Sequence, residues 1–238
     1  VGIRLHPGSN ELTVIATDLA GNSSIATSIV DFADSLGPTI EVSLMHDTGL
    51  SMQDFVTSNA TLSGRLRDPS GVSTFEARLN GGNWINTLPI VSSGFFTLNN
   101  DQYNQLFSTP VVSGSYRVDF RATDSIGNSS STSIAFTVDK AQPSIFAPDL
   151  DRSSDTGWSS SDNITSIIRP RMRFPVAPTQ LTTWFRNGHE IAHGFVDSGG
   201  MFTLPPLPDG NSVITVQVMD VAGNLSVESL PITITIDS

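Results

Sequence analysis

One local pattern occurs three times along the chain, at intervals of about one hundred residues. In each copy a stretch of alternating apolar residues runs into an Asp-x-x-Gly-Asn segment. The three copies end at Asp18–Asn22, Asp124–Asn128 and Asp220–Asn224. This period is far longer than a solenoid unit and matches the size of a small two-sheet domain, so the pattern restricts the chain to serial β domains.

A second motif, Asp-Thr-Gly-x-Ser-x-x-Asp, repeats with nearly the same spacing. It occurs at Asp47–Asp54 and again at Asp155–Asp162. Two independent motifs therefore agree on one period, which indicates that the repeat belongs to the whole chain and not to one kind of turn.

The residues before each Asp-x-x-Gly-Asn segment alternate between apolar and polar. In the first copy the apolar residues are Leu12, Val14 and Ala16, and the same alternation recurs at Val118–Ala122 and Ile214–Val218. A period of two predicts a strand with one face in a core. Gly-Asn tolerates positive φ, so each segment predicts a hairpin turn into a second strand.

We therefore predict an all-β fold of tandem immunoglobulin-like β-sandwiches, Greek-key in topology, with about seven strands each. Pro38 and Pro143 each reopen a strand after an acidic residue, which sets the domains at 38–139 and 140–238. Residues 1–37 hold only the closing strands of a preceding repeat. Because such a remnant cannot bury its apolar face alone, we expect an upstream continuation or another chain to cover it.

Composition excludes several classes of function. The chain of 238 residues has no Cys, which excludes disulfides, thiolate zinc sites and thiol catalysis, and favours a bacterial source. Its formal net charge is −11, with 12 Lys and Arg residues and no basic cluster, so nucleic acid and anionic membrane surfaces are poor partners. No run of about 18 apolar residues predicts membrane insertion.

The two motifs together resemble the immunoglobulin-like repeats of very large bacterial surface adhesins and related secreted proteins. Those repeats open with an acidic Ser-Asp-Thr-Gly-x-Ser-x-x-Asp-Asn-x-Thr stretch, which Ser154–Thr165 matches closely and Asp47–Thr57 more loosely. They close with Asp-x-Ala-Gly-Asn-x-Ser. The resemblance covers essentially the whole chain and implies an extracellular or cell-surface location in a bacterium, but it specifies no ligand.

One segment fits the H-E-x-x-H pattern of zinc proteases, in which a helix places two His on one zinc ion and Glu activates water. It runs from His189 to His193, directly after the hairpin signal Asn187-Gly188 and before Gly194. The matching segment of the preceding repeat has no His. We therefore predict a surface strand here, and since no other catalytic constellation is present, we expect no enzyme.

Acidic turns are the stronger candidates for binding an ion, because Ca²⁺ prefers six to eight oxygen ligands. In tandem sandwiches the loop after the first strand of one repeat comes near the last hairpin of the next, which predicts a calcium site at each junction. The candidate ligands are Asp47, Asp54, Asp139 and Asp220 at one junction, and Asp34, or Asp31, with Asp124 at the junction before it. The alternative is that these residues only form turns by accepting backbone hydrogen bonds.

The leading functional hypothesis is a structural spacer whose partners are neighbouring repeats of the same chain. One alternative is a module that binds a glycan or protein receptor through Trp158, Trp84 or the insertion 99–114, which we predict to be a loop with one helical turn. Another is an accessory repeat of a secreted hydrolase or of a filament, in which residues 1–37 pair with a neighbouring chain. We expect Trp184 in the core and Trp158 exposed.

Overall fold

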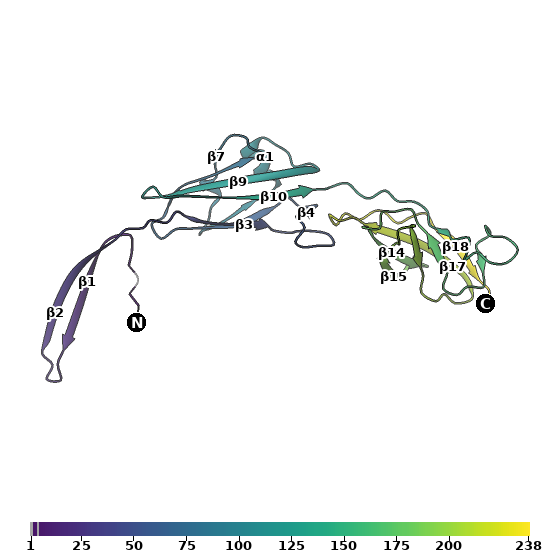
Figure 1. The fold of residues 1–238 in the computed structure, drawn as a ribbon, viewed down its shortest axis with the longest axis horizontal. Helices are drawn as coiled ribbons and strands as arrows, with labels where there is room; N and C mark the ends of the chain where they lie inside the picture. Colours follow the sequence, from purple (N-terminus) through teal and green to yellow (C-terminus); the bar gives the residue numbers. More distant parts are fainter. Residues whose placement is uncertain (1, 4) are drawn as a thin grey trace. The chain divides into compact units, whose positions relative to one another are not determined.

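The computed structural model describes residues 2–3 and 5–238, which form mainly β-strands, together with helix α1 (Asn100–Phe107) (Figure 1). The chain divides into two compact units. The first comprises Val1–Met45, Thr61–Val111 and Tyr116–Ala135, and the second comprises His46–Ala60, Val112–Ser115 and Phe136–Ser238. The units interleave along the sequence, and the domain limits expected at residues 38 and 140 stay a prediction.

The first two strands form a hairpin. Strand β1 (Gly8–Thr17) pairs antiparallel with β2 (Ser23–Phe32) along its whole length. One face carries the alternating residues expected from the sequence, but Val14 is 63% exposed, because no further strand pairs with β1 or β2 within the described residues. The hairpin therefore has the pattern of core strands without a core of its own.

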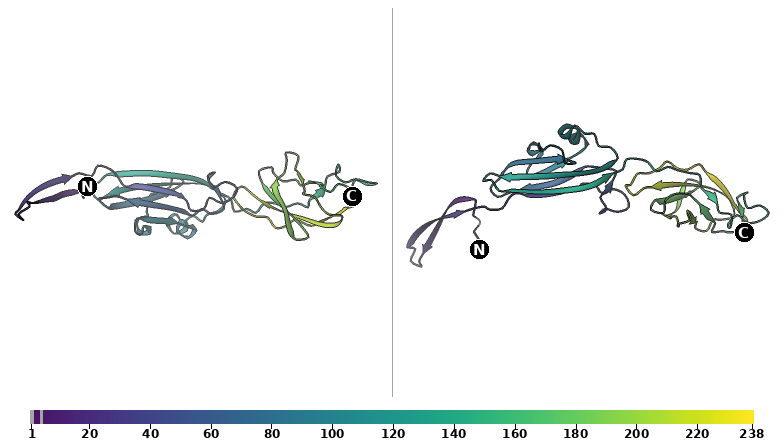
Figure 2. Two further views of the ribbon diagram at one scale, coloured as in Figure 1. Left: turned by 90° about the horizontal axis from the view of Figure 1, so that it is seen from below. Right: turned by 45° about the horizontal axis from the view of Figure 1, so that its top comes forward.

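Residues 39–138 contribute two sheets, whose strands run in two layers (Figure 2). The smaller sheet has the order β3-β5-β8, and the larger has the order β4-β10-β9-β6-β7. The bounds are β3 Thr39–Leu44, β4 Val56–Thr57, β5 Leu62–Arg67, β6 Val72–Leu79, β7 Ile85–Asn86, β8 Phe95–Leu98, β9 Gly114–Asp124 and β10 Ser129–Val138. The pairing of β4 with β10 is parallel, whereas β3–β5, β5–β8, β6–β7 and β6–β9 pair antiparallel. Strand order and layering confirm the predicted β-sandwich class.

Three phenylalanines fill the space between these sheets. The ring centroids of Phe75, Phe96 and Phe120 lie 5.0 to 5.6 Å apart, and each residue is at most 3% exposed. Gly64 of β5 leaves room for them, since a Cβ there would lie 2.1 Å from Cζ of Phe96. The core thus depends on one small residue facing large ones.

The insertion 99–114 forms a longer helix than the single turn expected. Helix α1 (Asn100–Phe107) is capped by Asn99, whose side chain accepts from the backbone N–H of Gln102 while the Gln102 side chain accepts from that of Asn99. This reciprocal cap offsets the cost of a short helix. In Figure 2 its coil lies outside the strands, and a 3₁₀ turn (Leu88–Ile90) precedes it in the chain.

The second half of the chain repeats this strand arrangement. One sheet has the order β11-β13-β16 and the other β12-β18-β17-β14-β15, with a parallel pair β12–β18 at the position of β4–β10. The bounds are β11 Asp149–Leu150, β12 Ile164–Thr165, β13 Arg171–Arg173, β14 Leu181–Arg186, β15 His189–Phe195, β16 Met201–Thr203, β17 Gly210–Met219 and β18 Ile232–Ile236. The repeat seen in the sequence is therefore a repeat of topology.

Trp184 lies at the centre of the second core, as predicted. It is 0% exposed, its ring stacks 5.2 Å from Phe202, and it meets Phe174 edge-on at 5.7 Å. Its Nε1 donates to Oγ1 of Thr182 at 2.9 Å, so the one polar atom of the ring is satisfied.

The H-E-x-x-H segment lies on strand β15, which confirms the expected strand. His193 Nδ1 lies 3.0 Å from Oε1 of Glu190, and both side chains are more than half exposed. A strand does not place residues i and i+4 around one ion as a helix does. Of the helices that the structure describes, none is long and apolar enough to cross a membrane.

Candidate metal centre

Each Asp-x-x-Gly-Asn segment forms a turn organised by its Asp. Oδ1 of Asp124 accepts from the backbone N–H of Ile126, Gly127 and Asn128 at 2.6 to 2.9 Å, and Oδ2 accepts from the Asn128 side chain at 2.8 Å. Oδ1 of Asp220 likewise accepts from the backbone N–H of Ala222 and Asn224, and Oδ2 from the Asn224 side chain, whereas Gly223 N donates to the Asp220 carbonyl oxygen. Asp124 and Asp220 therefore form turns by accepting backbone hydrogen bonds, which is the alternative role considered for them from the sequence.

In two of the three turns the Asn also holds the segment that precedes the repeat. The Asn128 side chain donates to the carbonyl oxygen of Asp34 at 3.2 Å, and the Asn224 side chain donates to that of Asp139 at 2.9 Å. The Asp34 and Asp139 carboxylates each accept from the backbone N–H two residues later. The two repeats thus position their entering segments in the same way.

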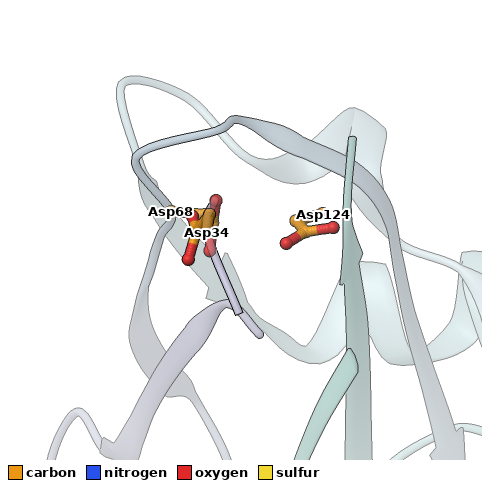
Figure 3. A group of neighbouring side chains, drawn as sticks. All are labelled: Asp34, Asp68 and Asp124. Atoms are coloured by element: carbon orange, nitrogen blue, oxygen red, sulfur yellow. The ribbon is translucent and has the colours of Figure 1, made fainter. Parts of the chain in front are cut away.

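Three carboxylates lie close together beside the Asp124–Asn128 turn. One oxygen from each of Asp34, Asp68 and Asp124 lies within 4.8 Å of the others, and Figure 3 shows Asp34 and Asp68 together, opposite Asp124. Oδ1 of Asp68 accepts from the backbone N–H and the hydroxyl of Ser70. Oδ2 of Asp34 is buried and has no hydrogen-bond partner within the described part of the chain. A buried carboxylate oxygen without a donor is a position where a cation or a water can bind.

Among the described residues, no cationic side chain pairs with the carboxylates of this cluster. Burial opposes the charge on Asp124, but the bonds from Asn128, Ile126 and Gly127 outweigh it and lower the pKa of Asp124. The turn therefore keeps Asp124 ionised next to two further carboxylates, an arrangement that a divalent cation stabilises.

The donor set fits a hard cation. All three side chains offer oxygen, no imidazole or thiolate belongs to the group, and two of the three residues are only partly buried, which leaves room for water ligands. Ca²⁺ accepts such a mixture of carboxylates, carbonyls and water in a flexible geometry, whereas zinc sites favour nitrogen and sulfur.

The structure brings together some of the expected ligands and leaves others apart. Asp34 and Asp124 lie in one group, as expected, and Asp31 is not part of it. Within the described residues no comparable group contains Asp47, Asp54, Asp139 or Asp220, and their role in binding a cation stays a prediction. The first two instead organise their own loop: Asp47 accepts from Phe55 N and Asp54 from Val56 N.

Asp68 was not among the expected ligands. It follows Arg67 at the end of β5, whereas in the second repeat Phe174 follows Arg173 at the end of β13 and is fully buried. A search for residues common to both repeats therefore misses Asp68. The Asp68-Pro69-Ser70-Gly71 sequence is typical of a turn, and it was the feature that could have indicated Asp68 as a further acidic turn residue.

The tryptophans considered for partner binding have different surroundings. The guanidinium groups of Arg78 and Arg121 lie 4.6 and 4.4 Å from the centroid of the Trp84 ring. These contacts occupy the ring that a sugar would use. Trp158 is fully exposed, as predicted.

Asp155 is a buried carboxylate in the second unit. It is 5% exposed, Oδ2 accepts from the backbone N–H of Asn163 at 3.4 Å, and Oδ1 has no partner among the described residues. Burial raises the pKa of Asp155, and the negative charges of Asp162 and Asp149 raise it further. The hydrogen bond from Asn163 acts in the opposite direction but does not outweigh them. The ionised group therefore destabilises the folded state at neutral pH.

Asp155→Asn removes this charge and keeps an acceptor oxygen. Because the folded-state pKa lies above the unfolded value, the destabilisation is absent at about pH 3 and grows as the pH rises through the pKa. We expect the variant to have the higher free energy of unfolding at pH 7 and to match the wild type at about pH 3, measured by urea denaturation. Asp151→Asn is the control of opposite sign, since the Ser153 hydroxyl lowers the pKa of Asp151. Equal stabilities at pH 7 would contradict the prediction.

Comparisons with known proteins concern the fold. Residues 142–238 match the family model described as a bacterial Ig-like domain, and no curated protein sequence matches the chain. The fibronectin(III)-like modules of Clostridium thermocellum CbhA are similar, with 12% identity and a TM-score of 0.48 over 84% of this chain and 94% of that chain. A Ca²⁺-stabilized adhesin that helps an Antarctic bacterium bind ice has 17% identity and a TM-score of 0.39 over 97% and 57%. A 1.5-MDa bacterial ice-binding adhesin has 20% identity and a TM-score of 0.40 over 95% and 73%.

Proposed function

Since residues 142–238 form a bacterial immunoglobulin-like domain, we propose that the chain is a structural spacer of an extracellular or surface protein, stiffened by Ca²⁺ at Asp34, Asp68 and Asp124. The observation that carries the proposal is this carboxylate cluster. Asp34 lies between the β1–β2 hairpin and β3, whereas Asp68 directly follows β5 and Asp124 is the last residue of β9. A cation shared by these three would fix the connecting segment to the sandwich.

Other features support a spacer. Apolar residues are packed into two separate cores, and the acidic surface gives a formal net charge of −11. Such a charge favours solubility and the binding of divalent cations. The Asn128 bond to Asp34 already holds the connecting segment at one point, so a cation would add a second restraint at the same place.

Calcium should stabilise the first unit by an amount that rises with the logarithm of its concentration above the dissociation constant. At a concentration one hundred times the dissociation constant, a ligand that binds only the folded state adds about 2.7 kcal/mol. We expect the thermal midpoint of the chelator-stripped protein to rise with added Ca²⁺. Asp68→Asn should raise the Ca²⁺ concentration required for the same shift at least tenfold. The matched control is Asp31→Asn, an exposed Asp outside the cluster, which should respond as the wild type does.

The same samples test the spacer. Small-angle scattering with Ca²⁺ should give a narrower distribution of dimensions than scattering in chelator, because the connecting segment loses freedom. Asp68→Asn should behave as the chelated protein in both conditions. A wild-type protein that shows neither a thermal shift nor a change in scattering with Ca²⁺ would remove the calcium proposal, and a compact particle in both conditions would remove the spacer.

A further inference from the structure

Two loops of the second unit are built on the same hydrogen bonds. We call Asp47–Ser58 the first Thr-Gly loop and Asp155–Ser166 the second Thr-Gly loop; both lie in the second unit. In each, the Thr hydroxyl accepts from a backbone N–H ten residues later and contacts a second Thr hydroxyl. The paired distances are Ser58 N–Thr48 Oγ1 2.7 Å with Ser166 N–Thr156 Oγ1 2.9 Å, and Thr48–Thr57 3.0 Å with Thr156–Thr165 3.2 Å. The loops are therefore structural copies.

The first Thr-Gly loop packs against the Asp220–Asn224 turn. The Thr48 hydroxyl donates to the carbonyl oxygen of Ala222 at 2.5 Å. Gly49 lies so close that a Cβ on it would be 2.0 Å from the carbonyl oxygen of Val221, and a Cβ on Gly223 would be 2.8 Å from the Gly49 nitrogen. Two glycines in contact through their backbones allow this approach, which any side chain would prevent.

The second Thr-Gly loop has the same surface without an occupant among the described residues. A Cβ on Gly157 would meet nothing within 4 Å, although its φ of +103° equals that of Gly49 within one degree. Trp158 follows Gly157 and is 107% exposed, whereas Leu50, in the same place of the first loop, is 39% exposed. The loop thus presents a formed contact surface with an aromatic residue beside it.

The chain also carries two other turns of the kind that the first loop holds, and the Asp18–Asn22 turn is the more similar of them in sequence. Asp18-Leu-Ala-Gly-Asn22 matches Asp220-Val-Ala-Gly-Asn224 at four of five positions. The internal bonds agree as well: Ala20 N and Ala222 N each donate to the Asp Oδ1 at 2.9 Å, and the Asn side chains donate to Oδ2 at 2.9 and 3.0 Å. Gly21 is open to solvent and Leu19 is 110% exposed. This turn is therefore a formed and accessible partner.

We propose that the second Thr-Gly loop binds the Asp18–Asn22 turn of a second copy of this chain. In that contact the Thr156 hydroxyl donates to the Ala20 carbonyl oxygen, Gly157 packs on Gly21, and Trp158 covers part of the turn. The loop belongs to the second unit and the turn to the first, so the contact is heterologous and joins copies head to tail. It requires no cation and stands apart from the calcium proposal.

Sedimentation equilibrium of the full chain in chelator tests the contact. We expect the weight-average mass to rise with protein concentration, and Gly157→Val or Gly21→Val to lower the association constant at least tenfold. An equimolar mixture of these two variants should associate again but stop at dimers, because one supplies an intact turn and the other an intact loop. Gly188→Val is the matched control, since Gly188 has a φ of +79° in an exposed hairpin and open space around it.

Each outcome decides the proposal. A wild-type protein that stays monomeric at all concentrations, or association that persists in both glycine variants, overturns it. Association that Gly188→Val weakens as much as Gly157→Val also overturns it, because backbone strain alone would then explain the loss. Thermal unfolding of every variant verifies that the second core is intact, so that loss of folding is not mistaken for loss of contact.

Discussion

Replacing Trp184 by alanine lowers the free energy of unfolding of the second unit by about 3–5 kcal/mol. The side chain is fully buried between Phe174 and Phe202, and its removal deletes two aromatic contacts together with the bond to Thr182. The Thr182 hydroxyl still donates to the Gly194 carbonyl at 2.6 Å, so the loss comes mainly from the cavity. A difference of this size is a large part of the stability of a small domain.

Urea denaturation followed by circular dichroism measures the effect, with Trp158→Ala as control. Trp158 is fully exposed and should change the free energy of unfolding by less than about 0.5 kcal/mol. The first unit should keep its hydrogen-exchange protection in Trp184→Ala, since its phenylalanine core is separate. Similar losses for the two Trp variants would show that the second core is not organised around Trp184.

The fold was predictable because strand alternation and turn chemistry repeat. The alternating residues at Val118–Ala122 and Ile214–Val218 are buried on β9 and β17, as expected. The same alternation at Leu12–Ala16 also predicts a strand correctly, but apolar residues of β1 such as Val14 are exposed. Alternation identifies the face that can enter a core, and only the partner strands decide whether it does.

The candidate metal centre was predictable in part. Asp34 and Asp124 were found because each has a counterpart in the repeat and lies beside a turn. Asp68 was missed because Phe174 takes its place in the second repeat, where that position faces the core. Repeat comparison finds residues that hold the shared fold, whereas a residue that gives one repeat a property of its own has no counterpart to reveal it.

The helix in the insertion shows another limit. The sequence predicted a loop with one turn, and the structure has eight helical residues. Intrinsic preference for a helix this short is weak, and Tyr103 supplies the missing stability by packing its fully buried ring near Tyr116 and Phe107. Such tertiary packing is not visible in the local sequence.

Gly64→Ala should lower the free energy of unfolding of the first unit by about 2–3 kcal/mol. The added Cβ would lie 2.1 Å from Cζ of Phe96 and 2.5 Å from the carbonyl oxygen of Glu41. The Glu41 oxygen belongs to β3, which is held to β5 by the sheet, so Phe96 must move, and it cannot do so without disturbing Phe75 and Phe120. Overpacking therefore spreads through the aromatic core.

Hydrogen exchange in increasing urea gives the free energy of opening of β5, β6 and β9 separately from the second unit. Ser63→Ala is the control. Ser63 precedes Gly64 in the same strand, its side chain points to the opposite face, and the change adds no atoms. We expect Gly64→Ala to reduce protection in all three strands and Ser63→Ala to leave it unchanged. Protection lost only at β5, with β6 and β9 unaffected, would mean that the three phenylalanines do not act as one packed group.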